Sequence, residues 1–379
     1  WNGWPDVIAV RSVAGHFLPI GGNEVTTYAG GAALAAAGHY NVWEPSQDCR
    51  FYAVDYMVDT NAKAQSVARI AADASANALL SVINHPNADY ALAPFGVPGS
   101  MSFIETGFDW VANKDLVAEF DAVEIWNGGN GFFTTAVGDY GHLFYFGKEH
   151  DPAYMDVPEG KHLSFARWYE LLNSGMQFPS VGASDSHERL NIVEGGLYDQ
   201  MIGGVRAMAG GQLPPLPASM LVGALGVEGA IMYQVKESAE LGIENLAMLP
   251  GSPRTYVHVD EDQLSPKAIA DAVRLGKSFV TNGPLVIATL NGAGYGNTVD
   301  IGSKQELSID IVSARPFEEI QIISDGQMVK EIALPGVTRF RDTIEVPELT
   351  GKRWMIVYVE GGPDYQFAYT NPIYLAGGK

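Results

Sequence analysis

Two patterns of apolar and polar positions divide the chain. Between residues 60 and 185, segments with apolar residues at helical spacing alternate with short apolar runs bounded by turn residues. The spacing predicts helices at residues 62–78, 114–120 and 163–173, and the runs predict strands at residues 79–83, 122–126 and 179–183. Helices that alternate with buried strands are typical of βα units around a mostly parallel sheet.

The C-terminal part has a different texture. A last helix is expected over residues 265–276, because Ser265 can act as N-cap, Pro266 suits the first turn and Gly276 can end the helix. Short β-rich runs then follow at residues 285–290, 307–311, 318–323, 343–346 and 354–359. These runs predict an antiparallel β-sandwich. We therefore expect a βα domain at residues 1–284 and a sandwich domain at residues 285–379.

Turn and aromatic residues add detail to the expected sandwich. Asn291-Gly292 and Pro335-Gly336 are expected to form turns between its strands. Tyr365, Phe367 and Tyr369 alternate with other residues, so they should share one strand face against the core or the preceding domain. The alanine- and glycine-rich residues 29–38 are expected to form a flexible loop.

Composition excludes several classes of protein. The 379 residues are 47% hydrophobic and 18% charged, which gives ample material for a core and argues against disorder. The formal net charge of −21 argues against a surface for nucleic acid or anionic membrane. The uncharged run between Arg206 and Glu228 contains several Gly and Pro residues, so no membrane span is expected there. A small anionic substrate held by a metal is still compatible with this charge.

Cysteine content limits the possible cofactors and locations. Cys49 is the single cysteine, so the chain has no internal disulfide and no cysteine cluster for structural zinc. A reducing compartment and an exported protein without disulfides both fit this content. Of the two, we favour the exported, periplasmic location.

Several histidines and acids follow predicted strands. Asp185 and His187 come directly after the strand at residues 179–183, and their spacing places both side chains on one side, where they could bind one metal ion. A turn in which Asp185 accepts backbone hydrogen bonds is the alternative. His85 follows the strand at residues 79–83, and Pro86 ends that strand; His85 is either a ligand or a surface histidine.

Three further candidates lie elsewhere in the first domain. Glu24 and His39 are expected in separate loops, where they are either metal ligands or solvated side chains. Glu124 lies inside the apolar run at residues 122–126, so its carboxylate must be paired, metal-bound or protonated. A supporting carboxylate beside a ligand histidine is the alternative for Glu124, and Asn127 follows it at the end of the strand.

The ordered motifs resemble those of a known superfamily. The segments G-N-E-V-T-T, G-H-Y-N, N-H-P-N, V-E-I-W-N-G, A-S-D-S-H-E, P-R-T-Y-V and G-K-S-F-V-T-N-G-P resemble the polymerase and histidinol phosphatase (PHP) superfamily, and more narrowly the CehA/McbA-type metallohydrolases. This resemblance implies a distorted, seven-stranded βα barrel followed by a β-sandwich. It also implies that divalent metal, zinc first and manganese or iron as alternatives, is bound by Glu24, His39, His85, Asp185 and His187.

The sequence departs from the family pattern in two places. The family's H-x-H and T-D-H motifs, which supply further ligands, do not occur in this sequence. Because the chain begins at Trp1, we expect them in an N-terminal segment upstream that completes the site; a degenerate, catalytically silent member is the alternative. Residues 189–252 form an apparent insertion, which is either a lid or association surface or a plain surface insertion.

The resemblance and the candidate residues together predict a metal-dependent hydrolase. Its small-molecule substrate would be a phosphoester, a carboxylic ester or a carbamate, attacked by metal-activated water. His187 or His85 could shuttle a proton, since imidazole titrates near neutral pH. Arg254, Glu124 and Asn127 are candidate substrate contacts, with a structural salt bridge as the alternative role for Arg254. A second hypothesis is a silent barrel whose sandwich binds a surface or glycan, and oligomeric state is left open.

Overall fold

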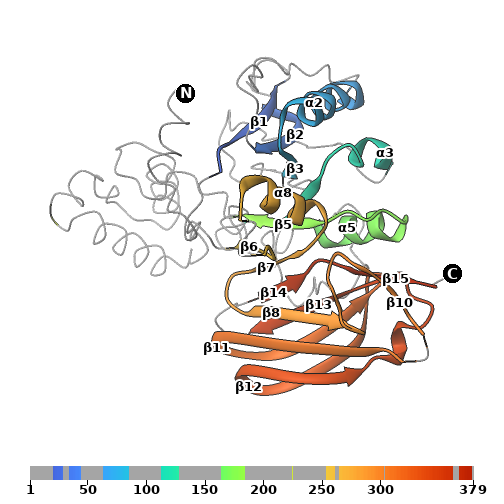
Figure 1. Ribbon diagram of the computed structural model, residues 1–379. Coiled ribbons are helices and arrows are strands. Elements are labelled where there is room, and N and C mark those ends of the chain that lie inside the picture. Colours follow the sequence, from blue (N-terminus) through green and yellow to red (C-terminus); the bar gives the residue numbers. More distant parts are fainter. Residues whose placement is uncertain are drawn as a thin grey trace, which may run out of the picture. The chain divides into compact units, whose positions relative to one another are not determined.

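The computed structural model describes residues 20–28, 34–43, 63–84, 112–127, 164–183, 224, 253–260, 264–302, 304–361 and 367–377. These residues form a five-stranded sheet and a ten-stranded sheet (Figure 1). The chain divides into two compact units, and the first contains residues 1–126, 152–181 and 255–379. Both sheets lie mainly in this first unit.

The five-stranded sheet has the order β1-β2-β3-β4-β5. Its strands are β1 (Gly22–Tyr28), β2 (Leu34–Trp43), β3 (Leu80–Asn84), β4 (Ala122–Asn127) and β5 (Ser180–Ala183). The connecting helices are α2 (Lys63–Asn77), α3 (Lys114–Val117) and α5 (Ser164–Asn173). β2 runs antiparallel to both β1 and β3, whereas β3 runs parallel to β4. The predicted alternation of helices with short buried strands is seen from α2 to β5, but the sheet is mixed rather than mostly parallel, and the expected seven-stranded βα barrel is not confirmed.

The β1–β2 hairpin differs from the sequence-based expectation. Residues 29–38 were expected to form a flexible loop, whereas β2 begins at Leu34 and continues to Trp43. Glu24 and His39 therefore lie within paired strands and not in loops. Tyr40 and Val42 are fully buried on one face of β2, as expected for a strand whose side chains alternate between two faces. The Ala- and Gly-rich composition obscures this alternation in the sequence.

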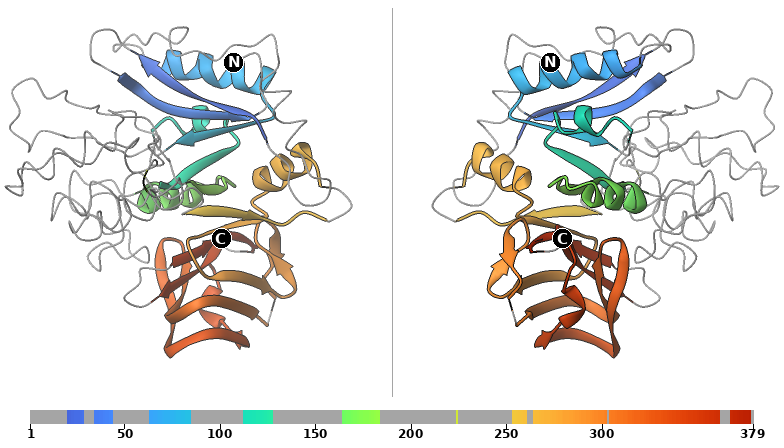
Figure 2. Two further views of the ribbon diagram at one scale, coloured as in Figure 1. Left: turned by 90° about the vertical axis from the view of Figure 1, so that its left-hand side faces the viewer. Right: turned by 90° about the vertical axis from the view of Figure 1, so that its right-hand side faces the viewer.

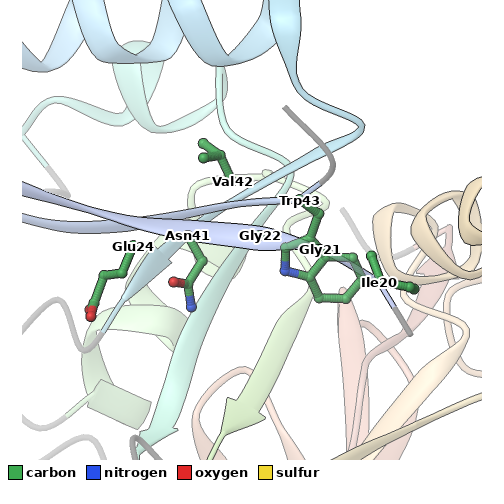
Figure 3. A pocket seen from close by; sticks show the side chains of 7 residues that line it. All are labelled: Ile20, Gly21, Gly22, Glu24, Asn41, Val42 and Trp43. Carbon is green, nitrogen blue, oxygen red and sulfur yellow. The ribbon is translucent and has the colours of Figure 1, made fainter. Parts of the chain in front are cut away.

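The two faces of this sheet have different surroundings. Val42 points toward α2 (Figure 3), and α2 lies against β2 and β3 (Figure 2). We call the opposite face the inner face. On it, Leu80, Val82, Ala122 and Val181 form an apolar cluster with two residues of α8 (Pro266–Arg274), Ala270 and Val273. The inner face is thus apolar where β3 and β4 begin.

The ten-stranded sheet follows the order β6-β7-β14-β13-β11-β8-β9, with β10, β12 and β15 attached beside this path. Its strands are β6 (Arg254–Val257), β7 (Ser278–Thr281), β8 (Leu285–Leu290), β9 (Ala293–Gly294), β10 (Thr298–Asp300), β11 (Glu306–Ser324), β12 (Gln327–Glu345), β13 (Trp354–Gly361), β14 (Phe367–Thr370) and β15 (Ile373–Ala376), with a 3₁₀ turn at Pro347–Leu349. β7 pairs with β14, so this sheet begins before residue 285.

This region is strand-rich and mainly antiparallel, as predicted, but it is not built from two separate sheets of short strands. β11 pairs with β8 through residues 307–312 and with β13 through residues 317–324, and its register shifts between these two stretches. One long bent strand therefore joins both halves into a single curled sheet. Pro335-Gly336, expected in a turn, lies inside β12 instead. The turn that joins β11 to β12 contains Asp325 and Gly326, both with positive φ.

Helix α8 begins and ends as its sequence predicts. Ser265 precedes the helix, and its Oγ accepts a hydrogen bond from the Ala268 backbone N–H at 3.1 Å. Gly276, just after the helix, has a φ of 68°, which a residue with a Cβ adopts at a cost. None of the helices in the described ranges is long and apolar enough to span a membrane.

Side chains of the two sheets are in contact within the first unit. Phe367 and Tyr369 of β14 are buried on one strand face, as expected, and Tyr365 lies outside the described residues. Both rings pack against Trp126 of β4. Tyr369 also packs edge-on against Phe165 of α5, with ring centroids 4.9 Å apart. The C-terminal sheet therefore shares an aromatic core with the strands and helices that precede it.

Candidate functional site

Three polar side chains from adjacent strands meet on the inner face. His39 Nδ1 lies 3.1 Å from Glu24 Oε1, and Asn84 Nδ2 donates a hydrogen bond to the same oxygen at 3.0 Å. In the neutral tautomer that is protonated on Nδ1, the ring of His39 donates to this carboxylate as well. The Glu24 carboxylate is thus held from two sides.

The strand register explains why these residues meet. His39 lies directly opposite Asn84 in the β2–β3 pair, and Glu24 lies opposite Asn41 in the β1–β2 pair. Side chains two residues apart on a strand share a face, so His39 is on the same face as Asn41 and Glu24. Asn84 likewise shares the face of Val82, which belongs to the apolar cluster. Polar residues therefore replace apolar ones toward the end of β3.

The three side chains differ in exposure. The side chains of His39 and Glu24 are 21% and 34% exposed, whereas Asn84 is 4% exposed. The Nε2 atom of His39 is nevertheless buried, so the accessible polar group of the three is the Glu24 carboxylate.

A cavity of about 370 Å³ adjoins Glu24. It is lined by Ile20, Gly21, Gly22, Glu24, Asn41, Val42 and Trp43. Glu24 and Asn41 point to the same side of the hairpin, and Val42 points to the other side (Figure 3). The cavity combines a carboxylate, an amide and an indole ring, so it can hold a small molecule through both polar and apolar contacts.

Glu124 is a buried acid on β4. It is 2% exposed, and its negative charge acts on Tyr369 of β14. Burial is the main reason why the pKa of Tyr369 lies well above its usual value, and the charge of Glu124 raises this pKa further. The expected burial of Glu124 inside an apolar strand is confirmed, while its expected role in binding substrate stays a prediction.

The remaining predicted site residues are placed only in part. Asn127 is the last residue of β4, but its side chain lies outside the described residues. His85, Asp185 and His187 also lie outside them. Arg254 is the first residue of β6 and is exposed.

The donors on the inner face fit a divalent metal ion in type. A carboxylate, an imidazole and an amide oxygen are ligands that zinc, manganese and iron accept. Within the described ranges, no group of three or more His, Cys, Asp or Glu side chains is close enough to hold a metal. Glu24 and His39 are two donors of the types that these ions accept, and His85 follows Asn84 directly in the sequence.

Sequence reasoning identified Glu24 and His39 but missed Asn84, Asn41 and Trp43. Asn84 could have been found from the strand pattern: Leu80, Val82 and Asn84 are each two residues apart, so the amide lies on the same face as two core residues. Asn41 and Trp43 follow His39 at a spacing of two residues each, so they share its strand face. Both patterns can be recognised only once these residues are known to form strands.

Comparisons of this chain with protein-family models, with curated proteins and with solved structures find no match.

Proposed function

We propose that this chain is a metal-dependent hydrolase that cleaves a phosphoester, a carboxylic ester or a carbamate. The observation that carries the proposal is the junction of Glu24 with His39, a carboxylate and an imidazole 3.1 Å apart on neighbouring strands. The motif order of the sequence supports the same function through its resemblance to PHP-type metallohydrolases. The exposed fraction of the Glu24 side chain leaves its carboxylate accessible to a small ligand.

The metal would be held by Glu24 and His39 together with His85, Asp185 and His187. When bound, a divalent ion supplies Lewis acidity that activates water near neutral pH and polarises the scissile group. In the tautomer protonated on Nδ1, the hydrogen bond from His39 to Glu24 would orient the ring for coordination through Nε2, the usual arrangement for a ligand histidine. Glu24 thereby also orients His39.

The other candidate residues would act on substrate and protons. His187 or His85 moves a proton to the leaving group, because imidazole exchanges protons near neutral pH. Arg254 pairs with an anionic group of the substrate, and Glu124 and Asn127 contribute polar contacts. The cavity beside Glu24, with Asn41 and Trp43 in its wall, accommodates a nonreacting part of the substrate.

Hydrolysis of chromogenic substrates tests this function. The full chain is loaded with Zn²⁺ or Mn²⁺ and assayed with and without EDTA. The substrates are p-nitrophenyl phosphate, p-nitrophenyl acetate and a p-nitrophenyl carbamate. We expect cleavage of at least one substrate, its loss with EDTA, and a loss of about 10- to 100-fold or more in His39→Gln. Ser81→Ala, a change on β3 but on the opposite face, is the matched control and should retain activity.

Cleavage that resists EDTA and is unchanged in His39→Gln would contradict the proposal. Stoichiometric metal binding without cleavage of any of the three substrate classes would favour the silent, binding-protein hypothesis instead.

A further inference from the structure

Asn84 has a buried side-chain oxygen to which none of the described residues donates a hydrogen bond. The side chain is 4% exposed, and Oδ1 accepts no hydrogen bond from any of the described residues. Most buried polar atoms in folded proteins are hydrogen bonded, so a buried acceptor without a donor calls for an explanation. The contact of Nδ2, at the other end of the amide, has to fit the same explanation.

The amide orientation follows from its contact with Glu24. Asn84 Nδ2 donates to Glu24 Oε1 at 3.0 Å. A flipped amide would set its oxygen against the carboxylate oxygen, and two acceptors would then face each other. The free acceptor is therefore Oδ1, and the side chain cannot satisfy it by rotating.

The position of Asn84 relates this oxygen to the candidate site. Asn84 lies directly opposite His39 in the β2–β3 register and is the last residue of β3. His85, a candidate ligand, follows it in the sequence. Amide oxygens bind hard divalent cations and also accept hydrogen bonds from water.

We propose that Asn84 is a positioning residue of the metal site: Nδ2 holds the Glu24 carboxylate in place, and Oδ1 supplies an oxygen to the coordination shell of the bound ion. This inference rests on the proposed function, because it needs a divalent ion at Glu24 and His39. It adds a residue that the ligand set predicted from sequence does not contain.

Calorimetric titration of the full chain with MnCl₂ tests the inference without an activity assay. Asn84→Leu removes both polar atoms, and we expect it to weaken Mn²⁺ binding about 10- to 100-fold. Asn84→Asp keeps an oxygen for the ion but replaces the Nδ2 donor to Glu24 with an acceptor, so it should weaken Mn²⁺ binding less than Asn84→Leu does. Ser81 lies on the same strand as Asn84 but donates its hydroxyl to Asp121, which precedes β4, so Ser81→Ala should leave the affinity unchanged.

The outcomes separate the two proposals. Equal Mn²⁺ affinity in the wild type and Asn84→Leu overturns the role of Asn84 but leaves the proposed function standing. Equal weakening in Asn84→Leu and Asn84→Asp also overturns it, because the amide would then act only in the fold. No Mn²⁺ binding by the wild type overturns the proposed function itself, and the role of Asn84 with it. Should Asn84→Leu fail to fold by circular dichroism, Asn84→Ala takes its place in the comparison.

Discussion

Tyr40 and Tyr369 are fully buried phenols in two different parts of the core. Tyr40 stacks on Phe120 with ring centroids 5.0 Å apart, and Tyr369 lies among the aromatic rings of β4 and α5. Burial raises the pKa of both side chains far above the usual value for tyrosine. It also raises the pKa of Tyr295 to about 12. All three residues therefore favour the folded state only while their hydroxyl groups keep their protons.

These shifts predict loss of stability at alkaline pH. A folded-state pKa above the unfolded value gives stability that is complete below the unfolded pKa, near 10 for tyrosine, and is lost as pH rises further. Each buried phenol should lower the free energy of unfolding by up to about 1.4 kcal/mol per pH unit above pH 10.

Urea titrations between pH 8 and about 11.5 measure this slope. Tyr40→Phe should reduce this slope by about 1.4 kcal/mol per pH unit, because one buried phenol fewer takes part. The same slope in the wild type and in Tyr40→Phe would show that Tyr40 does not titrate on unfolding.

Single residues of the site were predictable to different degrees. Glu24 and His39 stood out by residue type and motif, and their meeting at 3.1 Å agrees with a shared site. The contribution of Asn84 was not predictable from motifs, because it depends on the register of β2 against β3 and on which end of its amide faces Glu24. Register is a long-range property that local sequence does not fix.

At the level of elements, Asn371 connects two sheets through one side chain. It is fully buried, and its Oδ1 accepts a hydrogen bond from the Ser180 backbone N–H of β5 at 2.7 Å. Its Nδ2 donates to the Ser180 carbonyl at 2.9 Å and to Ser278 Oγ of β7 at 2.8 Å. One amide thus satisfies backbone groups at the ends of two strands that are far apart in the sequence.

Asn371→Ala should therefore be strongly destabilising. The substitution removes the side-chain partner of the buried Ser180 N–H, the Ser180 carbonyl and the Ser278 hydroxyl. We expect this loss to lower the free energy of unfolding by about 3 kcal/mol. Asn297→Ala is the matched control, because Asn297 is an exposed amide with a hydrogen bond to the Gly294 carbonyl. Its loss should cost about 0.5 kcal/mol or less. Equal midpoints of urea unfolding for the two variants would contradict this account of Asn371.

The helices and buried strands were predictable because their signals are local. Residues 62–78 carried helical spacing and residues 265–276 carried signals at both helix ends, and helices α2 and α8 formed there. The β1–β2 hairpin was missed because small residues mask its alternation. The runs at 307–311, 318–323 and 343–346 were predicted as short separate strands, because Pro and Gly residues between them resemble turns. The register shifts between Val312 and Glu319 absorb these residues, so that the two strands β11 and β12 are long and bent.

At the level of the whole molecule, the C-terminal sheet completes a core that the preceding residues begin. Trp168 of α5, 1% exposed, packs against Tyr369 of β14. Trp354 of β13 packs against Tyr169 and donates through Nε1 to Asn173 Oδ1 at 2.9 Å. These contacts cross the expected domain boundary near residue 285.

A fragment ending at residue 284 should therefore aggregate. It exposes the aromatic side chains of α5 and β4 and removes β14, the partner of β7, so that an unpaired strand edge is left. Size-exclusion chromatography and dye binding to exposed apolar surface check this expectation. A monodisperse fragment with a cooperative melting transition would show that the C-terminal sheet is a separable module.

The central claim, that Glu24 and His39 hold a divalent metal ion, is tested most directly by elemental analysis. The full chain is dialysed against Zn²⁺ or Mn²⁺, freed of loose metal and analysed beside a Glu24→Gln/His39→Gln variant, an Asp185→Asn/His187→Ala variant and the Ser81→Ala control. We predict stoichiometric metal in the wild type and the control, and little metal in the two ligand variants while their circular dichroism spectra stay unchanged. A wild-type chain without metal, or a Glu24→Gln/His39→Gln variant that retains as much metal as the wild type, would contradict the claim.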